Sequence, residues 1–359
     1  MSTEGPAKAG PHETAGPHAN PESRIPDPGS LAVRVEGLLK RFGSTTALDS
    51  VTFGVESGEL FGFIGPDGAG KTTLFRILVT LLVPDSGRAS VLGLDVVREY
   101  RALRQRVGYM AGRFALYPDL SVEENLRFFA SVFGTTIERE YAQIAPIYTQ
   151  LEPFKDRRAA ALSGGMKQKL ALCCALVHRP DILFLDEPTT GVDAVSRREF
   201  WDLLGNLKRS GLTIIVSTPY MDEADRCDRV ALIHRGRLLA VDAPAAITRA
   251  FDRPLLGVRA KERYKALLAL RRYEHAHSVY PFGEVIHYTD RRTEAAVERL
   301  EPELRAFLVA NGFADASVEP LAPSVEDTFI ARTAASDESR VPNPESESRI
   351  PTLESRGAS

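Results

Sequence analysis

Apolar and polar residues follow one another in blocks along this chain, and the blocks predict strands and helices in turn. Short apolar runs rich in β-branched and aromatic residues predict strands at residues 31–35, 51–55, 60–64, 107–110, 182–185 and 213–217. Helical stretches lie between these runs, which favours an α/β fold with a largely parallel sheet. Each of the last four runs ends where a distinctive motif begins. We therefore expect these motifs at the carboxyl edge of the sheet, where α/β folds bind ligands.

From about residue 249 onward the pattern changes to shorter and more polar elements. It predicts strand, helix, strand, strand, helix and strand at residues 255–258, 262–270, 278–280, 284–288, 294–309 and 316–319. That order is typical of a small ferredoxin-like α+β domain. We therefore expect a larger α/β domain over residues 31–245 and a small C-terminal domain over residues 250–332.

Both ends of the chain are expected to be disordered. Residues 1–30 contain six prolines and no aromatic residue, so they cannot bury enough apolar surface to offset the entropy of ordering. Residues 335–359 have the same character, and the pentapeptide ESRIP of residues 22–26 recurs at residues 347–351. We interpret the repeat as shared low-complexity composition, with a docking motif as the alternative. No apolar stretch follows Met1, so we expect no signal peptide.

The composition is that of an ordinary soluble protein, and it narrows the possible functions. Of the 359 residues, 26% are charged and 43% are hydrophobic, and the formal net charge is -3. A charge so close to neutral gives no general attraction to nucleic acid or anionic lipid. No apolar run reaches the roughly 18 to 20 residues of a membrane span, so a membrane role would come through a partner. Cys173, Cys174 and Cys227 have no metal-ligand spacing, and we expect them to be reduced and structural, as in a cytosolic protein.

A complete G-x-x-x-x-G-K-[ST] pattern follows the strand run 60–64 and leads into a helical stretch. Its residues are Gly65, Pro66, Asp67, Gly68, Ala69, Gly70, Lys71 and Thr72, and Thr73 comes next. Glycines let backbone N–H groups turn inward around phosphate groups, and the helix N-terminus adds its dipole. Lys71 is expected to reach the terminal phosphates and Thr72 to ligate Mg²⁺. The alternative, a glycine turn followed by a surface lysine, fits the strand-to-helix context poorly.

An apolar strand that ends in two acids supplies the second half of a nucleotide site. The run at residues 182–185 is followed by Asp186, Glu187 and Pro188. We expect Asp186 to hold Mg²⁺ and Glu187 to polarise the attacking water. A single acid would mean little because many buried strands end in Asp, but two adjacent acids before a proline make a stronger case.

Between these motifs, residues 162–168 have the sequence LSGGMKQ, and with it the chain resembles the ATP-binding subunits of ABC transporters. The resemblance covers about residues 33–242. It implies a P-loop NTPase fold: a parallel-sheet core, an antiparallel β-subdomain near the N-terminus and a helical subdomain at about residues 121–176. It also implies ATPase activity with ATP and Mg²⁺, and it makes residues 31–245 a nucleotide-binding domain.

The signature itself can bind an anion. Ser163, Gly164 and Gly165 precede the helix-forming stretch 166–176, so they present a hydroxyl, bare N–H groups and a positive dipole end. In the family this signature closes on the ATP of the opposite subunit, and the three residues would therefore bind nucleotide in trans. A simple helix cap is the alternative.

The resemblance also implies roles for a few other residues of this chain. Phe42 occupies the place of the aromatic residue that stacks on adenine, although such a residue alone is more often part of a core. The loop at residues 191–193 resembles the one that follows the catalytic acid and contacts the partner subunit. Ser163 and Asp193 would then both lie at an interface.

Two departures from the family pattern stand out. The family has a glutamine that senses Mg²⁺ where this chain reads Ala111, Gly112 and Arg113, and it has a histidine that contacts the γ-phosphate where this chain has Pro219. Loss of such a group typically costs about 10²- to 10³-fold in rate. Asp67 also adds a negative charge near the phosphates, and we expect it to face away from them.

These features predict a chain that binds MgATP at its own site but hydrolyses it slowly. Because the signature is intact, it could complete a partner's site, which favours a heterodimer with a second ATP-binding subunit over a homodimer. Residues 323–330 resemble the closing segment of ATPases from ABC-2 type exporters of the drug-resistance branch, and residues 278–283 resemble the appended domain of the same subfamily. The resemblance implies that residues 250–332 form a small regulatory or dimerisation domain. It also implies a separate membrane permease and a peripheral position on the inner face of the membrane. The alternative for 326 and 327 is a polar turn before a terminal strand.

Two other functions are alternatives to an energising ATPase subunit. The first is a regulatory or binding module that uses ATP as a dimerisation ligand with little hydrolysis, and the loss of the glutamine and histidine favours it. The second is a soluble ABC protein acting on ribosomes or DNA. That one is disfavoured because the chain shows one ATP domain, no long coiled coil and a near-neutral charge, so we expect no nucleic acid partner.

Overall fold

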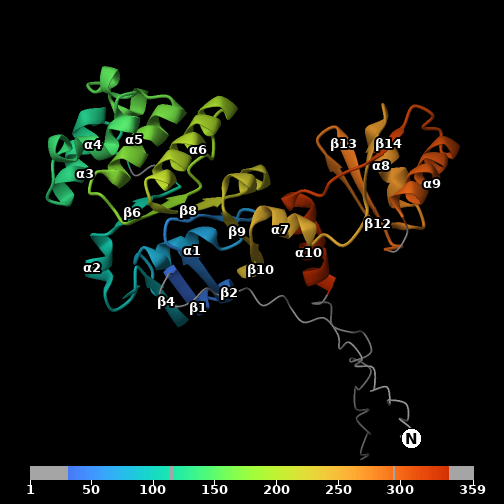
Figure 1. Ribbon diagram of the computed structural model, residues 1–359, viewed down its shortest axis with the longest axis horizontal. Coiled ribbons are helices and arrows are strands. Elements are labelled where there is room, and N and C mark those ends of the chain that lie inside the picture. Colours follow the sequence, from blue (N-terminus) through green and yellow to red (C-terminus); the bar gives the residue numbers. More distant parts are fainter. Residues whose placement is uncertain (1–30, 113–115, 294–295, 339–359) are drawn as a thin grey trace, which may run out of the picture.

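The computed structural model describes residues 31–112, 116–293 and 296–338, and three β-sheets organise them (Figure 1). Both expected tails, apart from residues 335–338, and both copies of ESRIP lie outside these residues. The central sheet has the order β10-β9-β3-β8-β7-β6. Its strands are β3 (Leu60–Ile64), β6 (Val107–Met110), β7 (Ile182–Asp186), β8 (Thr213–Thr218), β9 (Arg229–His234) and β10 (Arg237–Asp242).

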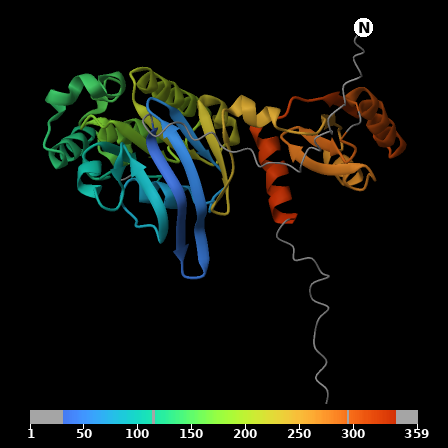
Figure 2. The same cartoon turned by 60° about the horizontal axis from the view of Figure 1, so that its bottom comes forward.

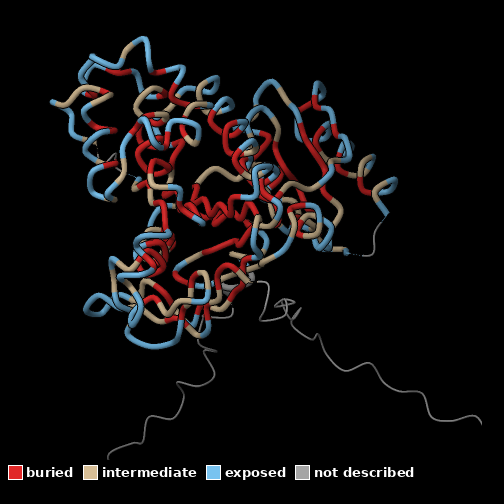
Figure 3. Tube along the Cα trace, turned by 60° about the vertical axis from the view of Figure 1, so that its left-hand side comes forward, coloured by how far each residue is buried: buried red, intermediate tan, exposed pale blue. Residues whose placement is uncertain are grey.

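The expected largely parallel sheet is confirmed. All neighbours in it pair in parallel except β9 and β10. Every residue of β3, β7 and β8 is buried, because structure covers both faces of the sheet, and this explains why these strands are continuous apolar runs. In Figure 3 the buried trace runs through the middle of the molecule.

Strands β9 and β10 were not among the expected strands. They form a hairpin whose two turn residues, Arg235 and Gly236, have positive φ angles of 47° and 78°. Positive φ at both positions is the geometry of a type I′ turn, which matches the twist of a hairpin. The signal in the sequence is the pair of apolar runs on either side of the Arg-Gly dipeptide.

A second sheet with the order β2-β1-β4-β5 confirms the antiparallel subdomain. Its strands are β1 (Leu31–Phe42), β2 (Thr45–Glu56), β4 (Ser86–Val91) and β5 (Leu94–Asp95). β1 and β2 are longer than expected because their hairpin projects from the domain, as Figure 2 shows. Residues 41–45 at its end are exposed, so no apolar pattern marks them.

Helices pack on both sides of the central sheet. They are α1 (Lys71–Leu78), α2 (Tyr100–Arg104), α3 (Val122–Val132), α4 (Ile137–Tyr148), α5 (Gly164–Leu176), α6 (Ala194–Arg209) and α7 (Pro244–Arg249), with short 3₁₀ turns η1 (Glu152–Phe154), η2 (Ala159–Ala161) and η3 (Met221–Arg226). α3 to α5 confirm the helical subdomain. In the described part of the chain no helix is long and apolar enough to cross a bilayer. Cys173, Cys174 and Cys227 are buried and form no disulfide.

The small C-terminal sheet confirms the ferredoxin-like order. β11 (Leu255–Arg259), α8 (Arg263–Arg271), β12 (Ala276–Phe282), β13 (Val285–Asp290), α9 (Val297–Ala310) and β14 (Ser317–Pro320) follow one another, and the sheet order is β12-β13-β11-β14. Leu256, Val258, Ile286 and Tyr288 of the sheet share one core with residues of α8 and α9.

The last helix, α10 (Val325–Glu338), rules out the alternative given for residues 326 and 327 and includes the first residues of the expected C-terminal tail. Residues 326 and 327 do not open a turn before a strand but form the first turn of this helix. Ser324 precedes it: its Oγ accepts from the Asp327 amide at 3.2 Å, and its own amide donates to Asp327 Oδ2 at 2.8 Å. This reciprocal cap starts the helix, which is then long enough to make residues 335–338 helical and not disordered.

α10 returns to the larger domain and packs beside α7 (Figure 1). The Thr328 hydroxyl donates to the Ile247 carbonyl at 3.5 Å, and the Arg332 guanidinium donates to the Leu239 carbonyl at 2.9 Å. The Phe329 ring lies 5.9 Å from the His234 ring. These contacts fix the C-terminal helix to the larger domain.

We expect Asp327 to stabilise this junction in a pH-dependent way. Burial alone would raise the pKa of Asp327, but hydrogen bonds from His287, Ser324 and Tyr280 outweigh it and lower this pKa to about 2. The contribution, about 2 kcal/mol, is complete above the unfolded pKa of about 4 and is lost as the pH falls toward 2. Asp327→Asn should lower the free energy of unfolding by that amount at pH 7, measured in urea.

The difference between wild type and Asp327→Asn should shrink below pH 4. Asp252→Asn is the control because the Asp252 side chain is 81% exposed, and it should change little. A difference that stayed constant down to pH 3 would contradict the assignment.

Candidate functional site

The ends of β3, β8, β7 and β6 lie side by side, and the phosphate-loop residues 65–70 connect β3 to α1. The loop needs bare backbone at two points. A Cβ on Gly65 would collide with the Ile233 carbonyl, and one on Gly70, which has φ 109°, would lie 2.5 Å from the Ala47 carbonyl oxygen. Gly68 has φ 76°. The loop is thus a glycine-dependent turn at a helix N-terminus, which suits a phosphate cradle.

Lys71 lies across this loop and points to the acids of β7. Its side chain is 3% exposed, and its Nζ donates to the carbonyls of Gly65 at 2.7 Å and Pro66 at 3.1 Å. The third contact is Glu187 Oε1 at 3.1 Å. A lysine ammonium has three donors. All three therefore have an oxygen partner, and phosphate oxygens could replace these partners.

The two acids are held by Ser217, a residue that no motif in the sequence marks. Its Oγ donates to Asp186 Oδ1 at 2.6 Å, and both its Oγ and its carbonyl lie 3.0 Å from the Glu187 amide, which donates to them. Asp186 is 2% exposed. Glu187 has φ 50°, a conformation that is costly for a residue with a side chain and persists where its surroundings fix it.

The residues expected to hold Mg²⁺ fit that ion. Thr72 follows Lys71 and Asp186 precedes Glu187, so the ion pair between Lys71 and Glu187 brings the start of α1 against the end of β7. A hydroxyl and a carboxylate are the hard oxygen ligands that Mg²⁺ prefers, together with phosphate oxygens and water.

Three other predicted ligands of nucleotide differ in their exposure to solvent. Asp67 is exposed and Thr73 is half-buried in the first turn of α1. Phe42 lies at the end of β1, is 52% exposed, and has the Lys40 Nζ 5.6 Å from its ring centre. Its ring is accessible to a flat ligand.

The signature residues form a separate, exposed surface. Ser163 caps α5 by accepting from the Met166 amide at 3.3 Å, and Ser163 and Gly164 are exposed. Gly165 is buried against α6, where a Cβ would lie 2.8 Å from Ser196 Oγ. The loop at residues 191–193 lies next to Gly164, and Asp193 caps α6.

The structure thus makes two groups of the predicted residues. It brings Lys71, Asp186 and Glu187 together, and it brings Ser163 and Gly164 together with the 191–193 loop. Gln168 of α5 connects them, because its side-chain amide donates to the Pro188 carbonyl next to Glu187.

Both departures from the family pattern border the acids. The backbone at Gly112 is so close that a Cβ there would lie 3.0 Å from the Asp186 carbonyl oxygen. Arg113 lies outside the described residues. Pro219 follows β8 directly, and the Tyr220 amide donates back to Thr218 Oγ1 at 3.1 Å.

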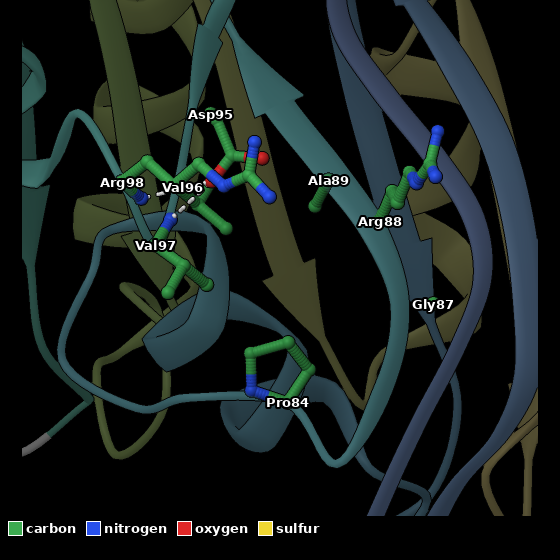
Figure 4. Close-up of a pocket in the computed structure, with 8 residues that line it drawn as sticks. All are labelled: Pro84, Gly87, Arg88, Ala89, Asp95, Val96, Val97 and Arg98. Carbon is green, nitrogen blue, oxygen red and sulfur yellow. Dashed lines mark hydrogen bonds between the residues drawn. The ribbon is translucent and has the colours of Figure 1, made fainter.

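Among the hollows that the described residues form, two bear on the function. Figure 4 shows one of about 400 Å³ beside β4, where the Asp95 carboxylate accepts from the amides of Val97 and Arg98 at 2.9 Å each. The second, of about 150 Å³, lies between β6, α3 and α5 and is mostly apolar, with Met110, Leu116, Phe129 and Phe133 in its wall. Phe128 packs against Phe129 with ring centres 5.5 Å apart, and it is 39% exposed.

This chain is similar in sequence to known ABC transporter proteins. The family model described as ABC transporter matches residues 48–190. The probable multidrug ABC transporter ATP-binding protein YbhF of Escherichia coli is 47% identical over 222 residues, which are 60% of this chain and 38% of YbhF. The chain therefore spans well under half of that relative. The Nod factor export ATP-binding protein I of Burkholderia lata is 43% identical over 211 residues, which are 58% of this chain and 69% of that protein.

Solved structures of ATP-binding subunits and cassettes are also similar to this chain. A structure described as the ATP-binding subunit of an ABC transporter is 30% identical with a TM-score of 0.56, and the match covers 61% of this chain and 93% of that one. A dimeric post-hydrolysis state of the ATP-binding cassette MJ0796, bound to ADP and Pi, is 25% identical with a TM-score of 0.54 and covers 59% of this chain and 98% of that one.

Proposed function

The chain belongs to the ABC transporter family of ATP-binding proteins, and on that premise we propose that it is an ATPase subunit that energises a separate membrane permease. The observation that carries the proposal is the cluster of Lys71, Asp186 and Glu187 at the glycine-dependent loop. Export is the proposed direction, because YbhF and the Nod factor protein are named as multidrug and export proteins.

In the proposed reaction each residue of the cluster has a defined task. The loop amides and Lys71 bind the β- and γ-phosphates, for which Lys71 gives up its contacts with Gly65, Pro66 and Glu187. Thr72 and Asp186 would hold Mg²⁺, which would neutralise charge on the phosphates. Once free of Lys71, Glu187 takes a proton from the attacking water.

The partner's site would be closed by the exposed signature. Ser163, Gly164 and Gly165 of one subunit would bind the ATP held by the loop of the other, so ATP binding drives dimerisation and hydrolysis reverses it. Because Gly112 and Pro219 supply no polar side chain at the chain's own site, hydrolysis there would be slow. A heterodimer with a more complete subunit therefore suits this chain better than a homodimer.

We propose that the permease binds at the apolar hollow between β6, α3 and α5, which we call the groove. It lies next to Gly112, and Phe128 and Tyr117 at its border are exposed although they are large and apolar. A cytoplasmic segment of the permease that fills this groove would cover them. The chain would then be peripheral on the inner face of the membrane.

Phe128→Ala should weaken this attachment. Removal of an aromatic contact that an interface buries typically costs about tenfold in affinity. The affinity of the tagged chain for membranes of its own host, measured by sedimentation over a range of membrane concentrations, should therefore fall by about tenfold. Tyr264→Ala is the matched control, because Tyr264 is 71% exposed but belongs to the small C-terminal domain. Equal loss for both variants would argue against the groove.

The decisive experiment is affinity purification of the tagged chain from membranes of its host. It should yield an integral membrane permease and a second ATP-binding subunit, and the isolated assembly should hydrolyse ATP. If no membrane protein is recovered, the transporter proposal fails. If the chain alone hydrolysed ATP as fast as the assembly, the proposal that its own site is slower than the partner's site would be wrong.

A second candidate is a regulatory module that uses ATP mainly as a dimerisation ligand. The absence of polar side chains at Gly112 and Pro219 is the observation in its favour. The two candidates predict different nucleotide occupancies for a variant that lacks the Glu187 carboxylate.

A further inference from the structure

A buried carboxylate in η3 joins the two loops that flank the acids. Glu223 is 3% exposed, and each of its oxygens accepts from a threonine: Oε1 from Thr189 Oγ1 at 2.9 Å and Oε2 from Thr218 Oγ1 at 2.5 Å. The chain's motifs do not include Glu223. It lies 34 residues from Thr189 in the sequence.

The environment of Glu223 holds its carboxylate in place. Arg197 Nε lies 3.9 Å from Oε1, while the Arg197 guanidinium lies 4.9 Å from the Tyr220 ring centre and also pairs with Asp222 at 3.2 Å. A buried carboxylate is costly unless hydrogen bonds and a counter-charge satisfy it. Here two hydroxyl donors and one cation do so.

One threonine is next to the turn that carries Glu187, and the other is hydrogen-bonded to the phosphate loop. Thr189 lies two residues after Glu187, and the Thr190 amide closes this turn by donating to the Glu187 carbonyl at 3.3 Å. The Thr218 carbonyl accepts from the Gly65 amide, at the start of the phosphate loop, at 3.3 Å. Glu223 therefore connects the turn of the acid to Thr218, and the Thr218 backbone continues the connection to the phosphate loop.

We propose that Glu223 is a positioning residue for ATP hydrolysis, which fixes Glu187 relative to the phosphate loop. This rests on the proposed ATPase function. Glu187 needs such support because its backbone has φ 50°, which only a firmly held segment maintains. Pro219 has no side-chain donor or acceptor, so it cannot supply the connection itself.

Glu223→Gln tests the proposal with little change of shape. The amide nitrogen cannot accept a hydrogen bond, so one threonine loses its acceptor. Because hydrogen bonds to a charged group are strong, kcat should fall by about tenfold or more in the purified assembly whose partner carries glutamine in place of its catalytic acid, with KM for ATP changed by less than about twofold. Thr189→Val removes the donor on the other side of the same bond and should lower kcat in the same way.

A second measurement does not depend on activity. In the nucleotide-free chain, amide hydrogen exchange at residues 186–191 should be about tenfold faster in Glu223→Gln than in wild type. Asp222→Asn is the control, because Asp222 is the neighbouring carboxylate on η3 and its side chain is 67% exposed. It should leave both exchange and kcat unchanged.

The outcomes separate the two proposals. If Glu223→Gln lowers the melting temperature but leaves kcat and the exchange of residues 186–191 unchanged, Glu223 is only structural and the proposal is overturned. Equal effects of Asp222→Asn would overturn it too, because they would indicate general charge loss. If the wild-type assembly has no ATPase activity, the proposed function fails, while the exchange experiment still decides whether Glu223 holds the acid.

Discussion

Glu187→Gln should lower single-turnover ATP hydrolysis at this chain's own site by about 10²- to 10³-fold, because an amide cannot take the proton of the attacking water. This rate is measured in the assembly whose partner carries glutamine in place of its catalytic acid. The same change should increase ATP retention. Glu187 pairs with Lys71 at 3.1 Å in the structure, and its removal leaves Lys71 free for the phosphates. The variant should therefore accumulate as an ATP-bound dimer, which gel filtration and nucleotide extraction would measure.

Glu199→Gln is a suitable control for this experiment. Glu199 pairs with Lys169 at 2.9 Å, but its side chain is 54% exposed and lies on α6 away from the phosphate loop. The Glu199→Gln variant should hydrolyse ATP at the wild-type rate. A Glu187→Gln protein with the same nucleotide occupancy as wild type would favour the regulatory module over the energising subunit.

Pro219→His should raise the rate of hydrolysis at this chain's own site by about tenfold to a hundredfold. Position 219 follows Ser217 and Thr218, which contact the acids and Glu223. A histidine there would bring to the γ-phosphate a polar group able to carry a proton, and such groups contribute about 10²-fold or more. The measurement is single-turnover hydrolysis by the assembly, with the partner's acid replaced by glutamine.

Pro219→Ala separates chemistry from backbone effects. It removes the proline ring without adding a proton carrier, so it should leave the rate low. If alanine raised the rate as much as histidine, relief of the proline's backbone restriction would be the cause. Gly112→Gln should help less, because its Cβ would lie 3.0 Å from the Asp186 carbonyl oxygen and would have to displace the strand end.

The sequence predicts the parts of the site that are contiguous in the chain. The phosphate loop, the acids of β7 and the signature are each a short run with its own pattern, and the buried strands that carry them are apolar throughout. Ser217 and Glu223 could not be found in this way. Ser217 lies 31 residues from Asp186, and only the parallel pairing of β7 with β8 brings them together.

Two of the elements that the sequence did not predict, β4 and α10, have related causes. β4 begins with three exposed residues, so no apolar run marks it, and it exists because it pairs with β1. The helix α10 begins with a short, mixed stretch that periodicity cannot assign. The packing of this segment on α7 and its cap at Ser324 make it a helix.

The course of α10 also changes how the small sheet is joined to the rest of the protein. The chain leaves the larger domain after α7 and comes back as α10, and Thr328 lies against Ile247 where the two paths meet. The ferredoxin-like unit is therefore an insertion between two adjoining helices and not a tail extension. Its entry and exit points are close together, as they are in loops that tolerate grafted domains. Gain or loss of the whole unit would thus leave the nucleotide-binding framework continuous through α7 and α10.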